Sequence, residues 1–217
     1  MKNAIAERRH TDQVEAPPRG ALEHRRQPVA RSNARHAWEK ARVRQPLAER
    51  RATGATERDT GLQKPELSFS AEYREIESPS HVATNFGVPS GTLVLERNYR
   101  TRYLAEPHSL GIVRSYLLRN DIAANPALLD STNEPWPGGT QSQLETVGIE
   151  FERITERVTA RAANAEESVE LGLREHEPVL VLEKVARDTA GIVVEVAHIV
   201  LPADRTTLEF VTPLDRW

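Results

Sequence analysis

PVLVLEKVARDTAGIVVEVAHIVLP, residues 178–202, predicts the two strands about which the rest of this fold is arranged. Two apolar runs rich in valine, leucine and isoleucine, at 178–188 and 192–202, flank Thr189, Ala190 and Gly191. β-Branched residues favour extended backbone, and a short segment that contains glycine favours a tight turn. We therefore expect an antiparallel pair of strands that supplies much of the core.

Further strands are predicted on both sides of this pair. Residues 67–76 carry apolar side chains at alternate positions, which is typical of a strand with one buried face. Residues 93–104 and 109–118 are expected to pair antiparallel, because the short AEPH segment between them suits a hairpin loop. Alternation also predicts strands at 149–161 and 206–214.

Short helices are predicted between these strands. Residues 78–88 read as a capped helix that ends at Gly87, and residues 164–173 as a helix with acidic residues in its first turn. Residues 120–130 and 141–148 are also expected to be helical. The fold class that follows is α+β, with an antiparallel sheet of about six strands and inserted helices.

NEPWPGGTQSQLETVGIEFERI, residues 133–154, begins with an aromatic loop that contains two prolines and two glycines. Gly138 and Gly139 would permit close approach of another group, and backbone N–H groups at the start of the following helix could hold an anion. A plain turn followed by a helix cap is the alternative. Trp136 could line a pocket, although packing in the core is the role we favour.

Composition excludes several classes of protein. The chain has 217 residues, of which 38% are hydrophobic and 28% charged, and it contains no run of 18 apolar residues and no secretory signal, so no membrane association is expected. Cysteine is absent, which removes disulfides and fits a cytoplasmic location. The histidines lack a metal-ligand spacing, and we expect neither a metal nor a cofactor.

The charge is unevenly distributed. Residues 1–60 hold 14 lysines and arginines against 8 acidic residues, whereas residues 61–217 hold 15 against 24. A basic arm on an acidic body suits contact with nucleic acid, and a solvated tail is the alternative. Residues 1–30 read as largely disordered, while 31–52 favour a helix interrupted at Pro46, with Trp38 available to dock it on the body.

The series of elements resembles a known family. An A-x-x-x-E-x-x-x-L-G-L pattern, then PVLVLEK, a turn, VVEV and Asp204-Arg205 occur in the order and spacing of the UTRA domain. This is the effector-binding half of HutC-type regulators in the GntR family, and its fold is similar to that of chorismate lyase. The resemblance implies an effector domain at 65–217, and a basic arm at 1–64 that is a linker or the remnant of a DNA-binding region.

The winged helix-turn-helix of such regulators has no counterpart here. PPRGALEHRR, residues 17–26, stands where the family carries its wing, and the preceding residues lack the apolar stripe of a recognition helix. We therefore expect an effector domain whose DNA-binding domain is missing or incomplete. DNA would be a partner only if a winged helix-turn-helix were supplied.

The resemblance also implies where the ligand binds. Basic residues of the strand at 93–104 and polar groups of the glycine-bearing loop would hold it, and the candidate ligand contacts are Arg97, Arg100, Arg102, Arg114, Thr140 and Glu195. Strand alternation places Arg100 and Arg102 on one face and Arg97 on the other, so only one set can face a pocket. Solvated arginines on an exposed face are the alternative reading.

Glu195 is a lone charge in an apolar strand, so we expect it to be paired or to face a polar cavity. His198, three positions later, is expected to be structural. Arg114 or Val113 stands where the family often has a glutamate, which favours a more acidic ligand.

The function implied is a sensor of an anionic or polar metabolite in a homodimeric transcriptional regulator, not an enzyme. Two alternatives remain open: an enzyme of the chorismate lyase type, and a standalone binding protein that forms heterodimers with a full-length regulator.

Overall fold

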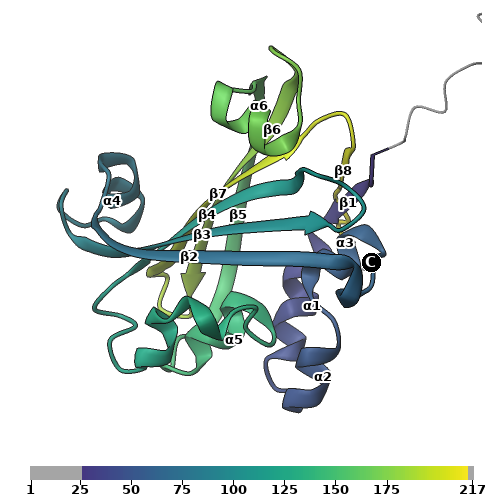
Figure 1. The fold of residues 1–217 in the computed structure, drawn as a ribbon. Helices are drawn as coiled ribbons and strands as arrows, with labels where there is room; N and C mark the ends of the chain where they lie inside the picture. The colour runs from purple at the N-terminus through teal and green to yellow at the C-terminus, as the bar shows by residue number, and fades with distance from the viewer. Residues whose placement is uncertain (1–25, 215–217) are drawn as a thin grey trace, which may run out of the picture.

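The computed structural model describes residues 26–214 and contains one six-stranded antiparallel sheet (Figure 1). The strands follow the order β2-β3-β4-β7-β6-β5. Their bounds are Leu67–Glu77 for β2, Leu93–Tyr103 for β3, Ser109–Leu118 for β4, Phe151–Ala162 for β5, Pro178–Asp188 for β6 and Val193–Pro202 for β7. The predicted α+β class is confirmed, and so is the antiparallel hairpin at its centre.

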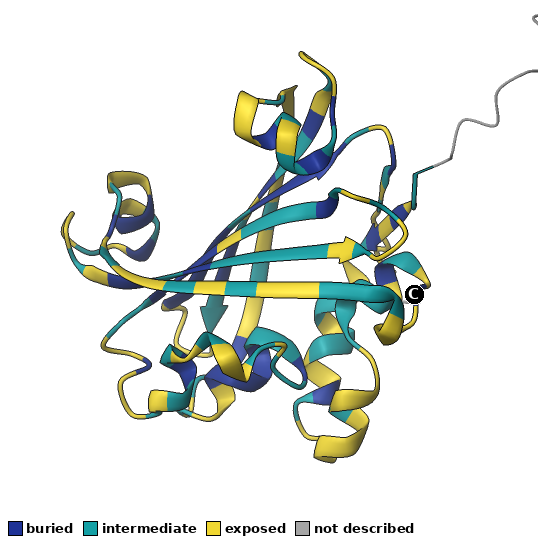
Figure 2. Cartoon of the chain, viewed as in Figure 1, coloured by how far each residue is buried: buried dark blue, intermediate teal, exposed yellow. Residues whose placement is uncertain are grey.

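The register of the central hairpin places two apolar strands side by side. Val181 lies opposite Val200 and Leu182 opposite Ile199, so branched side chains meet on both faces. β7 also pairs with β4, and all but one of its ten residues are buried. Figure 2 shows the contrast between this almost entirely buried strand and the edge strand β2, whose residues are intermediate or exposed.

Helices cover both faces of the sheet (Figure 1). α4 (Ser80–Phe86) and α6 (Ala165–Leu171) lie on one face, which we call the outer face. α5 (Gly139–Glu145) lies on the other, inner face, beside α1 (Ala34–Arg42), α2 (Leu47–Ala52) and α3 (Ala55–Thr60). The helices predicted at 78–88, 141–148 and 164–173 are therefore confirmed within two or three residues.

Local signals set the ends of two of these helices. α4 ends at Gly87, whose φ of 72° lies in the left-handed region that glycine adopts without strain. α6 begins with a capping box, in which the Asn164 side chain accepts from the Glu167 N–H and the Glu167 carboxylate accepts from the Asn164 N–H. Both signals act within four residues of sequence.

The helix expected at 120–130 is wrong. The structure has turns there, followed by short 3₁₀ segments at Pro126–Leu129 (η2) and Ser131–Asn133 (η3); a third, η1, spans Lys64–Glu66. Pro126 has no N–H to donate, and the Asn125 side chain accepts from the Ala127 N–H, which favours a tight turn over a helix. The segment still buries Ile122 and Leu128 in the core.

The N-terminal part is more ordered than the sequence suggested. β1 (Val29–Ser32) pairs in parallel with β8 (Thr206–Glu209), in a second, two-stranded sheet. Residues 29 and 30 are therefore not disordered, and the strand predicted at 206–214 is shorter and lies outside the main sheet. The rest of the disorder predicted for residues 1–30 falls largely on 1–25, outside the described residues.

Each face of the sheet has its own core, because neighbouring residues of a strand point in opposite directions. Leu95 and Leu117 pack against Leu144 of α5 on the inner face. Val94 and Tyr116, one position away, pack against Phe86 of α4 on the outer face. Within residues 26–214, no helix has the length and apolar character needed to cross a membrane.

Candidate ligand-binding site

A cavity of about 470 Å³ lies between the inner face of the sheet and the helices that cover it. Three parts of the chain line it. The floor comes from the inner face, one wall from the loop and helix start at 134–141, and the other wall from residues of β1 to α3 together with Lys64. A volume of this size is typical of a small-molecule site.

One row of side chains crosses the whole sheet beneath this cavity. The strand registers place its members next to one another in the order Tyr73, Arg97, Ser115, Ala197, Lys184 and Glu156. Directly paired residues on one face of a sheet are close enough to interact. Apart from Ala197 of β7, the row therefore gathers polar and charged side chains, from five of the six strands, under the cavity.

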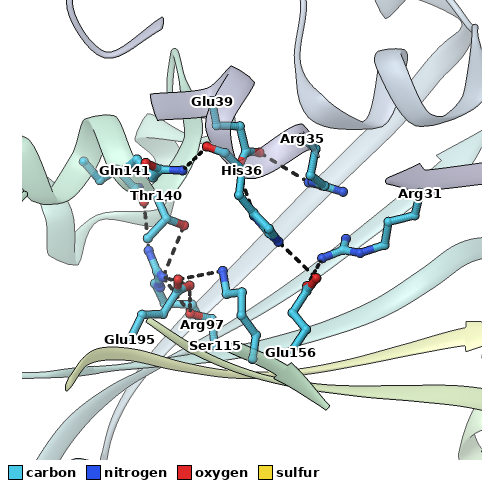
Figure 3. Close-up of polar contacts among 12 residues, drawn as sticks. Arg31, Arg35, His36, Glu39, Arg97, Ser115, Thr140, Gln141, Glu156 and Glu195 are labelled. Atoms are coloured by element: carbon cyan, nitrogen blue, oxygen red, sulfur yellow. Dashed lines mark hydrogen bonds and ion pairs between the residues drawn. The ribbon is translucent and has the colours of Figure 1, made fainter. Parts of the chain in front are cut away.

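Arg97 of this row forms a buried ion pair with Glu195, which lies on β7 two residues before Ala197 (Figure 3). Arg97 Nη2 lies 3.0 Å from Glu195 Oε1, and each residue is only 1% exposed. The Ser115 hydroxyl lies 2.6 Å from the guanidinium and 2.7 Å from the same carboxylate oxygen. Lys184 Nζ approaches the other oxygen of Glu195 to 2.7 Å. Glu195 is thus held by two cations and one hydroxyl.

The cations decide the protonation state of Glu195. Burial by itself would raise the pKa of this carboxyl, but the charges of Lys184 and Arg97 and the hydrogen bonds lower the pKa below its usual value. Glu195 is therefore ionised at neutral pH, and its negative charge is already neutralised within the protein.

A second set of contacts ties α5 and its loop to this row. Gln143 accepts a hydrogen bond of 2.8 Å from Arg97 Nη1 and donates one of 2.7 Å to Glu134. The Glu134 carboxylate also accepts from the Trp136 N–H at 2.6 Å and from the hydroxyls of Tyr73 and Tyr99. The aromatic loop is therefore fixed to the sheet by hydrogen bonds as well as by packing.

The glycines of the loop serve different purposes. Gly138 has a φ of 90°, and a Cβ on it would lie 2.2 Å from Ser142 Oγ and 3.2 Å from Arg50 Cδ. Gly139 has a φ of 70°, with no atom within 4 Å of a Cβ. Trp136 both lines the cavity and packs against the inner core, so it combines the two roles considered from the sequence.

The N-terminal wall is held by its own ion pairs. Glu156 of β5 lies 2.5 Å from Arg31 Nη2 and 3.0 Å from His36 Nε2 (Figure 3). Burial favours the neutral acid, but the hydrogen bonds and charges of His36 and Arg31 hold the pKa of Glu156 well below its usual range. The Gln141 side chain donates to the His36 carbonyl at 3.0 Å, which joins α1 to α5.

Ion pairs of Arg35 also connect the helices α1 and α3 of this wall. Arg35 forms ion pairs with Asp59 of α3 and with Glu39 one turn along α1. Burial alone would raise the pKa of Glu39, but Arg35 and His36 lower it to about 2. The short helices are therefore held together and against the sheet largely by charge.

The structure places the sequence-predicted site residues in two groups. Glu195 and Thr140 line the cavity, and Arg97 lies directly beneath it, with its Nη2 3.5 Å from Thr140 Oγ1. The other three, Arg100, Arg102 and Arg114, do not line it. They lie on the outer face, because successive residues of a strand point to opposite faces. Arg100 and Arg102 are an odd number of positions from the inward-facing Arg97, and Arg114 is one position from the inward-facing Ser115.

Contacts on that outer face account for two of these arginines. Arg114 Nε lies 3.1 Å from Asn98 Oδ1, and Arg100 Nε lies 3.5 Å from Glu170 of α6. Arg102 is exposed. In the sequence these arginines have the same charge and residue type as Arg97. They could have been excluded from the site only by knowing which face of the strand points toward the cavity.

Several residues at the cavity were not predicted, notably Ser115, Lys184, Glu134 and those of the N-terminal wall. One usable signal was present in the sequence. Arg35, Glu39 and Arg42 lie at i, i+4 and i+7, which is one face of a helix, and such a charged face is able to contact a polar partner. For Lys184 the comparable signal was a lone cation on an apolar strand whose predicted hairpin partner carries Glu195.

Comparison with known proteins agrees with this geometry. A family model described as the UTRA domain matches residues 70–207. No curated protein sequence matches the chain. A solved GntR-family transcriptional regulator superposes with a TM-score of 0.64 at 20% identity, over 74% of this chain and 64% of that chain.

PhnF from Mycobacterium smegmatis is also similar in fold. The full protein superposes with a TM-score of 0.58 at 19% identity, over 75% of this chain and 70% of PhnF. Its effector domain alone superposes with a TM-score of 0.55 at 20% identity, over 68% of this chain and 89% of that domain. At these identities the likeness shows the fold.

Proposed function

This chain belongs to the UTRA domain family, and on that premise we propose that its cavity binds a small anionic or polar metabolite as the effector of a HutC-type GntR transcriptional regulator. The observation that supports this most directly is the cavity itself. It lies between the sheet, the glycine-bearing loop and the N-terminal wall, and a fixed polar row runs beneath it.

We assign direct contact with the effector to Thr140 and Glu195, since both line the cavity. Arg97 has a different role. It is fully buried and holds Glu195 and Gln143, so it positions groups on both the sheet and α5. Arg100, Arg102 and Arg114 take no part in this assignment.

An effector in this cavity would contact the sheet and the N-terminal wall at the same time. Binding would therefore favour the arrangement in which β1 to α3 are docked on the inner face. The N-terminal wall follows residues 1–25 in the chain. A change in its docking is therefore a route by which effector binding in the cavity could alter contact with a DNA-binding partner.

We propose that the ligand leaves the cavity unchanged. The carboxylates closest to the floor are poor general bases, because Glu195 is neutralised by Arg97 and Lys184 and Glu134 accepts hydrogen bonds from four groups. The pKa of Glu195 is lowered, and a carboxylate with a lowered pKa has little tendency to remove a proton from a substrate.

Several wider assignments belong to the same proposal. We propose an effector-binding unit at 65–217 and an N-terminal arm at 1–64, a homodimer, a cytoplasmic location, and DNA binding only where a winged helix-turn-helix is supplied. Sedimentation of the full chain tests the dimer, since a monomer at high protein concentration would refute it.

Isothermal titration with a library of anionic and polar metabolites tests the central proposal. The wild-type chain should bind at least one metabolite saturably, Glu195→Ala should abolish that binding, and Arg114→Ala on the outer face should leave the affinity unchanged. Equal affinity in wild type and Glu195→Ala would refute the site. Conversion of chorismate to 4-hydroxybenzoate by the protein would refute the proposed sensor role.

A further inference from the structure

The charged groups that line the cavity are mostly occupied by one another. Glu195 is paired with Arg97 and Lys184, and Arg31 is paired with Glu156. Within residues 26–214 Arg42 forms no ion pair, but it donates to three backbone carbonyls, those of Glu49, Arg50 and Thr53. These groups could bind a ligand ion only by giving up a partner that they already have.

Arg50 is different. Its side chain lines the cavity from α2 and lies against the loop, with Cδ 3.2 Å from the position of a Cβ on Gly138. The Arg50 Nε atom is buried and has no hydrogen-bond partner within residues 26–214, and no carboxylate of that range forms an ion pair with its guanidinium. A buried, unpaired donor on a cation is costly unless a ligand satisfies it.

The balance of the remaining lining charges is positive. Arg42 and Glu134 also lack an ion pair among the described residues, but hydrogen bonds satisfy both; of the other lining charges without one, the cations are Arg50, Arg51 and Lys64 and the carboxylate is that of Glu57. Arg51 and Lys64 are exposed, so Arg50 is the cation among these three that the cavity encloses in part. The ligand that fits this balance carries a single negative charge that one guanidinium can neutralise.

Part of the cavity floor is apolar. Tyr99, Val113 and Ile199 are neighbours across β3, β4 and β7, and Phe69 packs on Tyr99 with ring centroids 5.8 Å apart. All four line the cavity. A ligand that covers these side chains gains free energy from burying apolar surface, whereas a ligand covered with hydroxyl groups would lose hydrogen bonds to water there.

We propose that the effector is a compact amphipathic monocarboxylate, such as an aryl-substituted or branched-chain acid, whose carboxylate pairs with Arg50 while its apolar body rests on Tyr99, Val113 and Ile199. This inference rests on the proposed function, and it specifies the ligand class of the same cavity. It also assigns a ligand contact to the N-terminal part of the chain, so the acid bridges α2 and the sheet.

Isothermal titration of the full chain with 3-phenylpropionate, its amide and glucose 6-phosphate tests this class. The acid should bind saturably, and the amide should bind at least about 10-fold more weakly because it lacks the charge. Arg50→Gln should lower the affinity for the acid about 10-fold to 100-fold and leave that for the amide unchanged. Arg44→Gln, at an exposed arginine that does not line the cavity, should change neither by more than about 2-fold.

A second variant tests the apolar floor independently of the charge. Val113→Thr keeps the shape of the side chain but adds a hydroxyl, and it should lower the affinity for the acid about 5-fold. Equal binding of acid and amide, or an unchanged affinity in Arg50→Gln, overturns the inference. Binding of glucose 6-phosphate with none of the acid also overturns it but leaves the proposed effector site intact. If none of the three probes binds, the assignment of a monocarboxylate ligand is overturned. The titrations with the metabolite library then test the proposed function separately.

Discussion

Replacing Glu195 with glutamine removes the negative charge that lies between two buried cations. The change keeps the size of the side chain and retains an amide oxygen that can still accept from Arg97 and Ser115. What it removes is the charge that neutralises Arg97 at 3.0 Å and Lys184 at 2.7 Å. The variant therefore separates the contribution of charge from that of packing.

The size of the effect follows from burial. Removing one partner of a buried ion pair typically lowers the free energy of unfolding by 3–5 kcal/mol, because the other charge stays buried without compensation. Glutamine preserves part of the hydrogen bonding, so we expect a loss of about 3 kcal/mol. For a domain of this size each kcal/mol corresponds to about 2–4 °C, and the melting temperature should fall by about 6–12 °C.

The effect should also depend on pH in a defined direction. The pKa of Glu195 is lower in the folded protein than in the unfolded chain, so its charge contributes stability that is present in full above the unfolded pKa and is lost as the pH falls through the folded pKa. The difference between wild type and Glu195→Gln should therefore be largest near pH 7 and should narrow below about pH 4.5.

Urea unfolding followed by circular dichroism at pH 7 and at pH 4 measures both quantities. Glu183→Gln is the matched control, since Glu183 lies on the neighbouring strand β6 but is exposed, and it should change the free energy of unfolding by less than about 0.5 kcal/mol. A Glu195→Gln variant as stable as this control, or a difference that is the same at both pH values, would refute the assignment of a neutralising charge to Glu195.

Three further perturbations test the parts around this centre. Gly138→Ala should lower the free energy of unfolding by about 3 kcal/mol, because its Cβ would meet Ser142 at a φ of 90°, whereas Gly139→Ala should cost about 1 kcal/mol; denaturant titrations of the two variants measure the difference. Glu156→Gln should increase the rate of tryptic cleavage in α1 to α3, and a cleavage pattern equal to wild type would count against Glu156 as the anchor of that wall. Asn164→Ala should reduce stability by about 1 kcal/mol through loss of the α6 cap, measured by urea unfolding, and an unchanged midpoint would contradict this.

Most elements of the fold could be predicted from local patterns. Alternation along β3 separates Arg97 from Arg100, and the structure confirms that the two point to opposite faces. Gly87 and Asn164 mark helix ends because their effects on backbone dihedrals and on unpaired N–H groups act within one turn. Where local signals competed, as around Pro126, the prediction of a helix failed.

The candidate site was only partly predictable. Glu195 stood out because a single charge on an apolar strand needs a partner, but the identity of that partner depends on which strands are neighbours. The sequence predicts that β7 pairs with β6, which carries Lys184, but it gives no sign that β7 also lies beside β4, which brings Ser115 to the same carboxylate. Arg50 and Gly138 are likewise far apart in sequence and meet only because α2 lies against the loop that precedes α5.

The sequence by itself determined most of the secondary structure of the body, the alternation of side chains along each strand and the need to neutralise Glu195, because propensity, alternation and capping act between residues a few positions apart. The tertiary structure decided which face of each strand points toward the cavity and which cations neutralise that carboxylate. It also decided that residues of β1 to α3 form a wall of the cavity. Coulombic and dispersion energies depend on separation in space, and that separation is set only when strand order and helix docking are complete.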